Sequence, residues 1–159
     1  MATHVWQYPA QDRQGISLPE IHQIGDVSRA VLIAGRLLFG GFFLYSGIHH
    51  FLDASSMVSF AAAKGVRFPE AAILLTGVML VIGSLSVLLG YRPHIGAGLI
   101  ALFLIGVTPV MHNFWTEQGP ARMSDMMNFT KNVALLGGAC FVAAVPEPWP
   151  ASATRVKSA

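Results

Sequence analysis

Long apolar runs dominate the pattern of the chain, at residues 30–52, 71–89, 95–112 and 127–145. Each run is close to the ~20 residues that a helix needs to cross a hydrocarbon core about 30 Å thick. The runs are continuously apolar and do not alternate with polar residues, so they fit membrane helices better than the strands of a barrel. The pattern therefore predicts an all-α fold, an integral membrane four-helix bundle.

The sequence divides into a central membrane domain and two tails. The four runs lie within residues 30–145, which we expect to form one domain. The N-terminal tail, residues 1–29, contains Ser17–Glu20 with the spacing of a capping box, which predicts a short amphipathic helix that ends at Gly25. Residues 146–159 form a Pro-rich C-terminal tail.

A shorter apolar stripe lies in the connection between the first two runs. Residues 55–64 read as a short helix that ends at Gly65, and Met57, Phe60 and Ala61 share one of its faces. A short helix with one apolar face is typical of the membrane interface. We therefore expect this segment to lie on the membrane and not to cross it.

The composition agrees with a membrane protein and excludes several other classes. Charged residues make up 11% of the chain, against about a quarter in an average soluble domain, and hydrophobic residues make up 53%. The net charge is only +2 and the basic residues are scattered, so we expect no nucleic-acid partner. A single cysteine, Cys140, cannot form an intrachain disulfide or a CxxC redox pair.

The basic residues predict how the bundle sits in the membrane. With four spans, both termini and the connection between the second and third spans lie on one side. That side carries six Lys and Arg residues against four on the other, which favours both termini in the cytoplasm and a bacterial inner-membrane location. The six are Arg13, Arg29, Arg36, Arg92, Arg155 and Lys157, and the four are Lys64, Arg67, Arg122 and Lys131.

Polar side chains collect where three of the predicted spans meet the same face of the membrane. Histidines, carboxylates and a lysine at the end of a helical bundle can form a site that handles protons or binds a polar ligand. The alternative is that they only cap the helices, since polar residues gather wherever the interface lies. The ligand candidates are His50, His112, Lys131, Asn132 and Arg36, and the possible ion-pair partners of Lys131 are Asp53, Glu70, Glu117 and Asp125.

Three of these residues carry more specific expectations. His49 and His50 are adjacent on a helix, so at most one of them faces the bundle centre. Lys131 lies about one turn inside the fourth run and needs an acidic partner or a ligand. Arg36 lies inside the first run, where it either snorkels to the interface, binds a polar head group or pairs within the bundle. No run contains an HxxxH or ExxH pair, so we predict no metal site.

Short motifs follow one another through the runs in a fixed order. They are GRLLFG at 35–40, FLYSG at 43–47, HF at 50–51, AKGVRFP at 63–69, HNFW at 112–115 and FTKNVALLGG at 129–138. Their order and spacing resemble the DoxX family of four-helix bacterial inner-membrane proteins. Many members of that family carry a glutamate in the second helix before a Gly-Gly pair, whereas residues 74–84 here have only Thr76 as a polar side chain before Gly83 and Ser84.

The resemblance implies a redox-associated function. Named members resemble the quinone-reactive membrane subunit of thiosulfate oxidation, and others are linked to redox-stress complexes. We therefore expect a quinone-associated subunit, with His112, Lys131 and His50 near the quinone head group. The chain has no flavin or nucleotide motif and carries no cofactor of its own, so electron transfer needs a partner redox protein.

Other functions fit the same residues. A non-catalytic structural or assembly subunit of a larger membrane complex is the main alternative, and a homo-oligomer in lipid is compatible with both functions. A small-solute carrier fits less well, because the middle of the membrane has almost no polar lining and no broken helix is evident.

Overall fold

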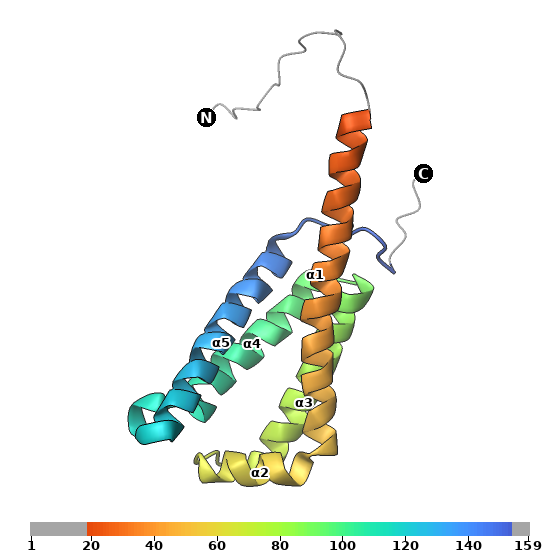
Figure 1. Cartoon of the computed structure of the whole chain (residues 1–159). Helices are drawn as coiled ribbons and strands as arrows, with labels where there is room; N and C mark the ends of the chain where they lie inside the picture. Colours follow the sequence, from red (N-terminus) through yellow and green to blue (C-terminus); the bar gives the residue numbers. More distant parts are fainter. Residues whose placement is uncertain (1–18, 154–159) are drawn as a thin grey trace, which may run out of the picture.

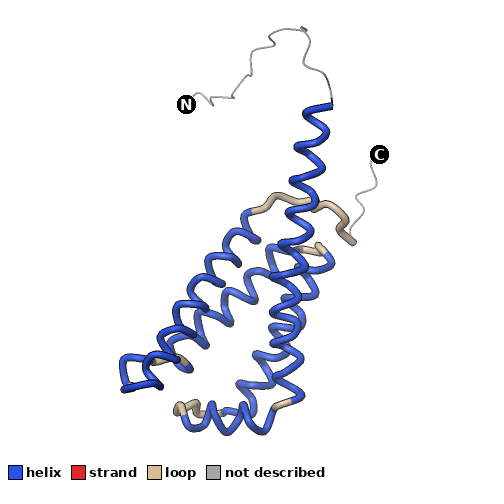
Figure 2. The backbone as a smooth tube through the Cα atoms, viewed as in Figure 1, coloured by secondary structure: helices blue, strands red, loops and turns tan. Residues whose placement is uncertain are grey.

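Helices make up nearly all of the part of the chain that the computed structural model describes, residues 19–153, with side chains described from residue 25 onward (Figures 1 and 2). No strand occurs in this range, which confirms the all-α prediction. The elements are α1 (Pro19–Leu52), α2 (Ala54–Ala63), α3 (Pro69–Leu89), α4 (Pro93–Met111), the short 3₁₀ helix η1 (Phe114–Thr116) and α5 (Gly119–Ala144).

Three of the long helices can cross a membrane by their length and apolar composition. These segments are Gly25–Leu52, Pro69–Leu89 and Pro93–Thr116, which agree with the first three predicted spans. The fourth predicted span, except its last residue, lies within α5, which falls short of this standard and has Asn128, Lys131 and Asn132 in its apolar run. The membrane crossing of α5 therefore stays a prediction.

The structure corrects the N-terminal boundary and supports the short second helix. The expectation of a separate helix ending at Gly25 is wrong, because α1 continues from Pro19 through Gly25 into the span. One glycine in a helix costs only about 1 kcal/mol, and a formed helix extends more easily than a new one nucleates. The first two residues of the predicted capping box lie outside the described residues. The short helix α2 ends at Ala63 with Lys64 as its C-cap, and Gly65 follows with φ +82°, a conformation that glycine adopts readily.

The long helices pack in the order α1, α3, α4, α5, each antiparallel to the next (Figure 1). The buried residues of α1 form one stripe at spacings of three and four, which is the face that packs against α3. They are Arg36, Gly40, Phe43, Gly47 and His50. The polar members of this stripe are therefore at its two ends.

Close backbone contact brings α3 and α4 together at one end of the bundle. A Cβ atom on Gly96 would lie only 2.5 Å from the carbonyl oxygen of Gly83, so neither position has room for a larger side chain. From this crossing the two helices separate toward α2 (Figure 2). We call the end with the crossing the tail end and the other the α2 end.

The residues that follow α5 return across the tail end. Trp149 is buried there, and its indole Nε1–H donates to the carbonyl oxygen of Val145 at 3.2 Å. The backbone N–H of Ala153 donates to the carbonyl oxygen of Leu89 at 2.8 Å. Residues 145–153 therefore form part of the folded bundle, whereas the sequence predicted only a Pro-rich tail.

Candidate functional site

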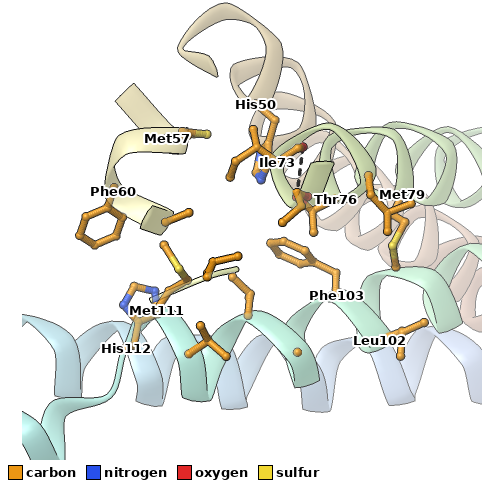
Figure 3. Close-up of a pocket in the computed structure, with 17 residues that line it drawn as sticks. His50, Met57, Phe60, Ile73, Thr76, Met79, Leu102, Phe103, Met111 and His112 are labelled. Carbon is orange, nitrogen blue, oxygen red and sulfur yellow. Dashed lines mark hydrogen bonds between the residues drawn. The ribbon is translucent and has the colours of Figure 1, made fainter. Parts of the chain in front are cut away.

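A cavity of about 560 Å³ lies at the α2 end, where α3 and α4 have separated (Figure 3). Its volume is within the usual range of small-molecule sites, and nearly all of its wall is apolar. The apolar face predicted for α2, Met57, Phe60 and Ala61, closes one end of it. Leu75 and Leu102 also line it and are 61% and 60% exposed, so the cavity opens between the helices toward the apolar outer surface.

His50 brings an unpaired nitrogen to the cavity wall from α1. Its imidazole is buried, and Nδ1 lies 2.8 Å from the backbone carbonyl oxygen of Ser46. A carbonyl oxygen only accepts hydrogen bonds, so Nδ1 must carry the proton and Nε2 is left as an acceptor. The ring meets Phe103 of α4 edge to face, with 6.0 Å between the ring centroids (Figure 3).

His112 brings a second imidazole to the cavity, directly after α4. Its Nδ1 lies 3.4 Å from the Oδ1 atom of Asp125, in the second turn of α5. An ionised carboxylate also only accepts, so this contact again favours the proton on Nδ1 and a free Nε2. The two histidines thus share one hydrogen-bonding arrangement, although they come from different helices.

Lys64, directly after α2, binds three polar side chains that lie between His112 and the second turn of α5. Its ammonium lies 2.9 Å from Oδ1 of Asn113, 3.0 Å from Oε1 of Glu117 and 2.9 Å from Oδ2 of Asp125. The hydrogen bond from Lys64 lowers the pKa of Asp125 below its ordinary value. The hydrogen bond to Asp125 and, to a smaller extent, the hydrogen bond to Glu117 raise the pKa of Lys64. Both partners therefore stay charged near neutral pH.

Thr76 of α3 is the third polar side chain at the cavity. It is the only polar side chain in residues 74–84 before Gly83 and Ser84. Its hydroxyl donates to the backbone carbonyl oxygen of Ala72 at 2.7 Å, which leaves its oxygen free only to accept. The cavity therefore offers acceptors from three helices or their ends, and none of the described residues in its wall is a carboxylate.

The structure separates the other candidates from this cavity. His49 points away from it, with Nδ1 3.1 Å from the carbonyl oxygen of Tyr45, so the two adjacent histidines do face different directions. Lys131 is exposed and donates to Oδ1 of Asn128 at 2.9 Å, not to any of the four carboxylates expected as partners. Asn132 is buried in α5 but does not line the cavity.

The four acidic candidates divide into two pairs. Glu117 and Asp125 bind Lys64, whereas Asp53 and Glu70 are exposed and have no side-chain partner among the described residues. Among residues 19–153, no group of three or more His, Cys, Asp or Glu side chains is arranged to hold a metal ion.

Arg36 lies at the tail end, 14 positions before His50 on the same helix. It is buried, and its guanidinium donates to the carbonyl oxygens of Pro150 at 2.5 Å and Leu88 at 2.6 Å. The guanidinium carbon also lies 5.5 Å from the centroid of the Trp149 ring. Of the three roles expected for Arg36, the structure thus shows pairing within the bundle, with backbone groups as partners.

Lys64 is the residue that sequence reasoning missed. The sequence places it only at the end of the predicted short helix, in the AKGVRFP motif and in the charge balance, because its three partners lie 49 to 61 positions further along the chain. The available signal was its position directly after an apolar helical face and before Gly65, which marks a helix end but does not identify partners.

A match to a known protein family covers the part of the chain that contains the cavity. A family model described as DoxX matches residues 31–113, which are 83 of the 159 residues. The chain belongs to the DoxX family. Every residue that lines the cavity falls within the matched range, so the site lies in the part that this DoxX-family protein shares with its relatives.

A curated relative gives the same membrane setting. The chain is similar to the inner membrane protein YphA of Escherichia coli (strain K12), with 26% identity over 131 residues. The similarity covers 82% of this chain and 93% of YphA. No solved structure matches this DoxX-family protein.

Proposed function

We propose that this DoxX-family protein binds a quinone, in its reduced quinol form, within the cavity at the α2 end, as a subunit of a membrane redox system. The observation that carries the proposal is the pair of histidines, His50 and His112, that present acceptor nitrogens to an apolar cavity open to the lipid-facing surface. A quinol has two hydroxyl donors on its ring and an apolar tail that can extend between the helices into lipid.

The hydrogen-bonding roles favour the reduced form over the oxidised form. Both histidines use their Nδ1 hydrogen on protein oxygens, so their Nε2 atoms accept hydrogen bonds in the neutral state. Quinol hydroxyls donate, whereas the carbonyl oxygens of an oxidised quinone only accept. Oxidation of a quinol releases two protons and two electrons, and the Nε2 atoms of His50 and His112 can each take up one of the protons. The electrons need an acceptor on a partner protein, which is why we propose a subunit and not a complete enzyme.

Equilibrium binding to the purified protein in mild detergent tests this proposal. We expect a short-tailed ubiquinol analogue to bind more tightly than its oxidised form. His50→Leu and His112→Leu should each raise the Kd for the quinol about five- to tenfold, because each removes one hydrogen bond. His49→Leu is the matched control and should leave the Kd unchanged. Binding of neither form would refute the proposal and favour a non-catalytic subunit of a larger complex.

We also propose that α5 crosses the membrane and that both termini lie in the cytoplasm of a bacterial cell. The distribution of Lys and Arg supports this orientation. Single cysteines at Gln118 and Ala151, in a Cys140→Ser background, flank α5 and can be labelled in intact cells with an impermeant reagent. Labelling at position 118 alone is expected. Labelling at both positions would contradict the crossing, and labelling at position 151 alone would reverse the orientation.

A further inference from the structure

We infer that Asp125 and Lys64 are positioning residues that hold the His112 imidazole with its acceptor nitrogen toward the cavity. This inference rests on the proposed function for its purpose, but the geometry that carries it is independent of any ligand. The three side chains come from α5, from the end of α2 and from the turn after α4, so the arrangement exists only when these parts are assembled.

The two oxygens of Asp125 have separate partners. Oδ1 faces Nδ1 of His112 at 3.4 Å, and Oδ2 lies 2.9 Å from the ammonium of Lys64. Because the carboxylate can only accept, the proton of a neutral imidazole is drawn to Nδ1. In water the neutral ring would be free to carry its proton on either nitrogen. Asp125 therefore selects the tautomer. In proteins, the hydrogen bond made by one ring nitrogen of a histidine commonly decides which nitrogen carries the proton.

Lys64 limits the movement of the carboxylate. Its side chain is only 13% exposed, and that of Asp125 only 14%. Lys64 also binds Asn113, the residue directly after His112, so one ammonium restrains both the orienting carboxylate and the backbone that carries the imidazole. Since Lys64 follows α2, whose apolar face lines one end of the cavity, the orientation of His112 depends on the position of α2.

Nitrogen-15 NMR of histidine-labelled protein, without any ligand, gives a readout that a purely structural role would not change. Spectra are recorded at increasing pH, and the tautomer is read where the imidazole signals no longer change with pH. The His112 signal is identified by its loss in His112→Gln. We expect the Nδ1–H tautomer to dominate in the wild type and the Nε2–H tautomer to gain in Asp125→Leu.

Two further variants divide the role between the partners. Lys64→Met should give an intermediate mixture, because the carboxylate remains but is less restrained. Glu117→Gln is the matched control, since Glu117 binds Lys64 without touching His112, and it should keep the wild-type tautomer. The Kd for the quinol analogue should rise about five- to tenfold in Asp125→Leu, less in Lys64→Met, and stay unchanged in Glu117→Gln.

The possible results separate this inference from the proposed function. A wild-type His112 that is mainly Nε2–H would overturn the inference, as would an unchanged tautomer in folded Asp125→Leu protein. If Asp125→Leu does not fold, an unchanged tautomer in Lys64→Met would overturn the part assigned to Lys64. A wild type with the expected tautomer that binds no quinol would refute the proposed function alone.

Discussion

Each end of the bundle contains a cation, buried at the tail end and half-buried at the α2 end, and the two cations bind different kinds of partner. At the tail end, Arg36 donates to two backbone carbonyls beneath a buried tryptophan, beside a crossing where α3 and α4 touch through glycines. At the α2 end the same helices have separated around a cavity, and Lys64 binds carboxylates close to the surface.

This difference indicates a division of labour along the helices. The planar guanidinium of Arg36 suits several fixed acceptors in a sealed environment, whereas the ammonium of Lys64 makes ionic contacts that depend on the charge of its partners. The tail end therefore holds α3 and α4 together, and the α2 end contains the cavity that lies between them. Mutations at the two ends should have different effects.

The largest effect is expected at the helix crossing. Gly96→Ala would place a methyl group 2.5 Å from the Gly83 carbonyl oxygen, so α3 and α4 must move apart, at a cost of about 2–3 kcal/mol in the free energy of unfolding. Gly98→Ala, two residues away with nothing within 4 Å of the new Cβ, is the control and should be neutral or slightly stabilising. Unfolding in mild detergent measures both, and equal stability of the two variants would contradict the crossing.

A smaller loss is expected when the tail end is opened. Arg36→Met leaves the carbonyls of Pro150 and Leu88 without their charged donor and should destabilise the fold by about 2 kcal/mol. It should also release the tail, measured as faster proteolysis after residue 145. Arg29→Met, at an exposed position, is the control. A tail that stays resistant in Arg36→Met would show that Trp149 alone retains it.

The α2 end should respond to pH as well as to mutation. Lys64→Met is expected to cost about 1 kcal/mol near neutral pH, since it removes contacts that are close to solvent. The pKa of Asp125 is lowered from 3.8, so its contribution is present above pH 3.8 and is lost as the pH falls through the lower folded value. The pKa of Lys64 is raised from 10.5, so its contribution is present below pH 10.5 and is lost above the higher folded value.

The stability difference between the wild type and Lys64→Met should therefore be constant between these limits and shrink outside them. Thermal unfolding in detergent at a series of pH values measures it. A difference that already disappears at pH 6 would mean that another group, and not the Asp125 carboxylate, is the main partner of Lys64.

The smallest effect is expected at Lys131. Its only side-chain hydrogen bond within the described residues is to Asn128 on the same helix, so Lys131→Ala should change the free energy of unfolding by less than about 0.5 kcal/mol. Quinol binding should also be unchanged. Weaker binding in Lys131→Ala than in Lys64→Met would restore Lys131 as the functional lysine.

The sequence predicts the helices well because their signals are local. Continuous apolar runs define α1, α3 and α4, and the stripe before Gly65 defines α2. The opposite directions of His49 and His50 also follow from helical geometry alone. The cavity could not be predicted in this way, because it depends on how α3 and α4 diverge from their close contact at Gly83 and Gly96.

The partners of the two cations were also beyond local reasoning. The acceptor of Arg36 at Pro150 lies 114 positions away, and the carboxylate that Lys64 shares with His112 lies 61 positions away. The sequence favours Lys131 because it lies inside an apolar run, but in the structure its ammonium donates to the neighbouring Asn128. Depth in a predicted span is therefore a weaker guide to a site than the direction in which the helix faces.

The most direct test of quinol binding at the α2 end is to fill the cavity without disturbing the fold. Gly106 of α4 lines the cavity, and a Cβ atom there would meet nothing within 4 Å, so Gly106→Leu should occupy the space that a ligand would use. Gly98→Leu adds the same side chain to the same helix outside the cavity. We predict that both variants keep the wild-type melting temperature and that only Gly106→Leu loses binding of the ubiquinol analogue. Equal binding by the two variants would contradict the assignment of the cavity as the quinol site.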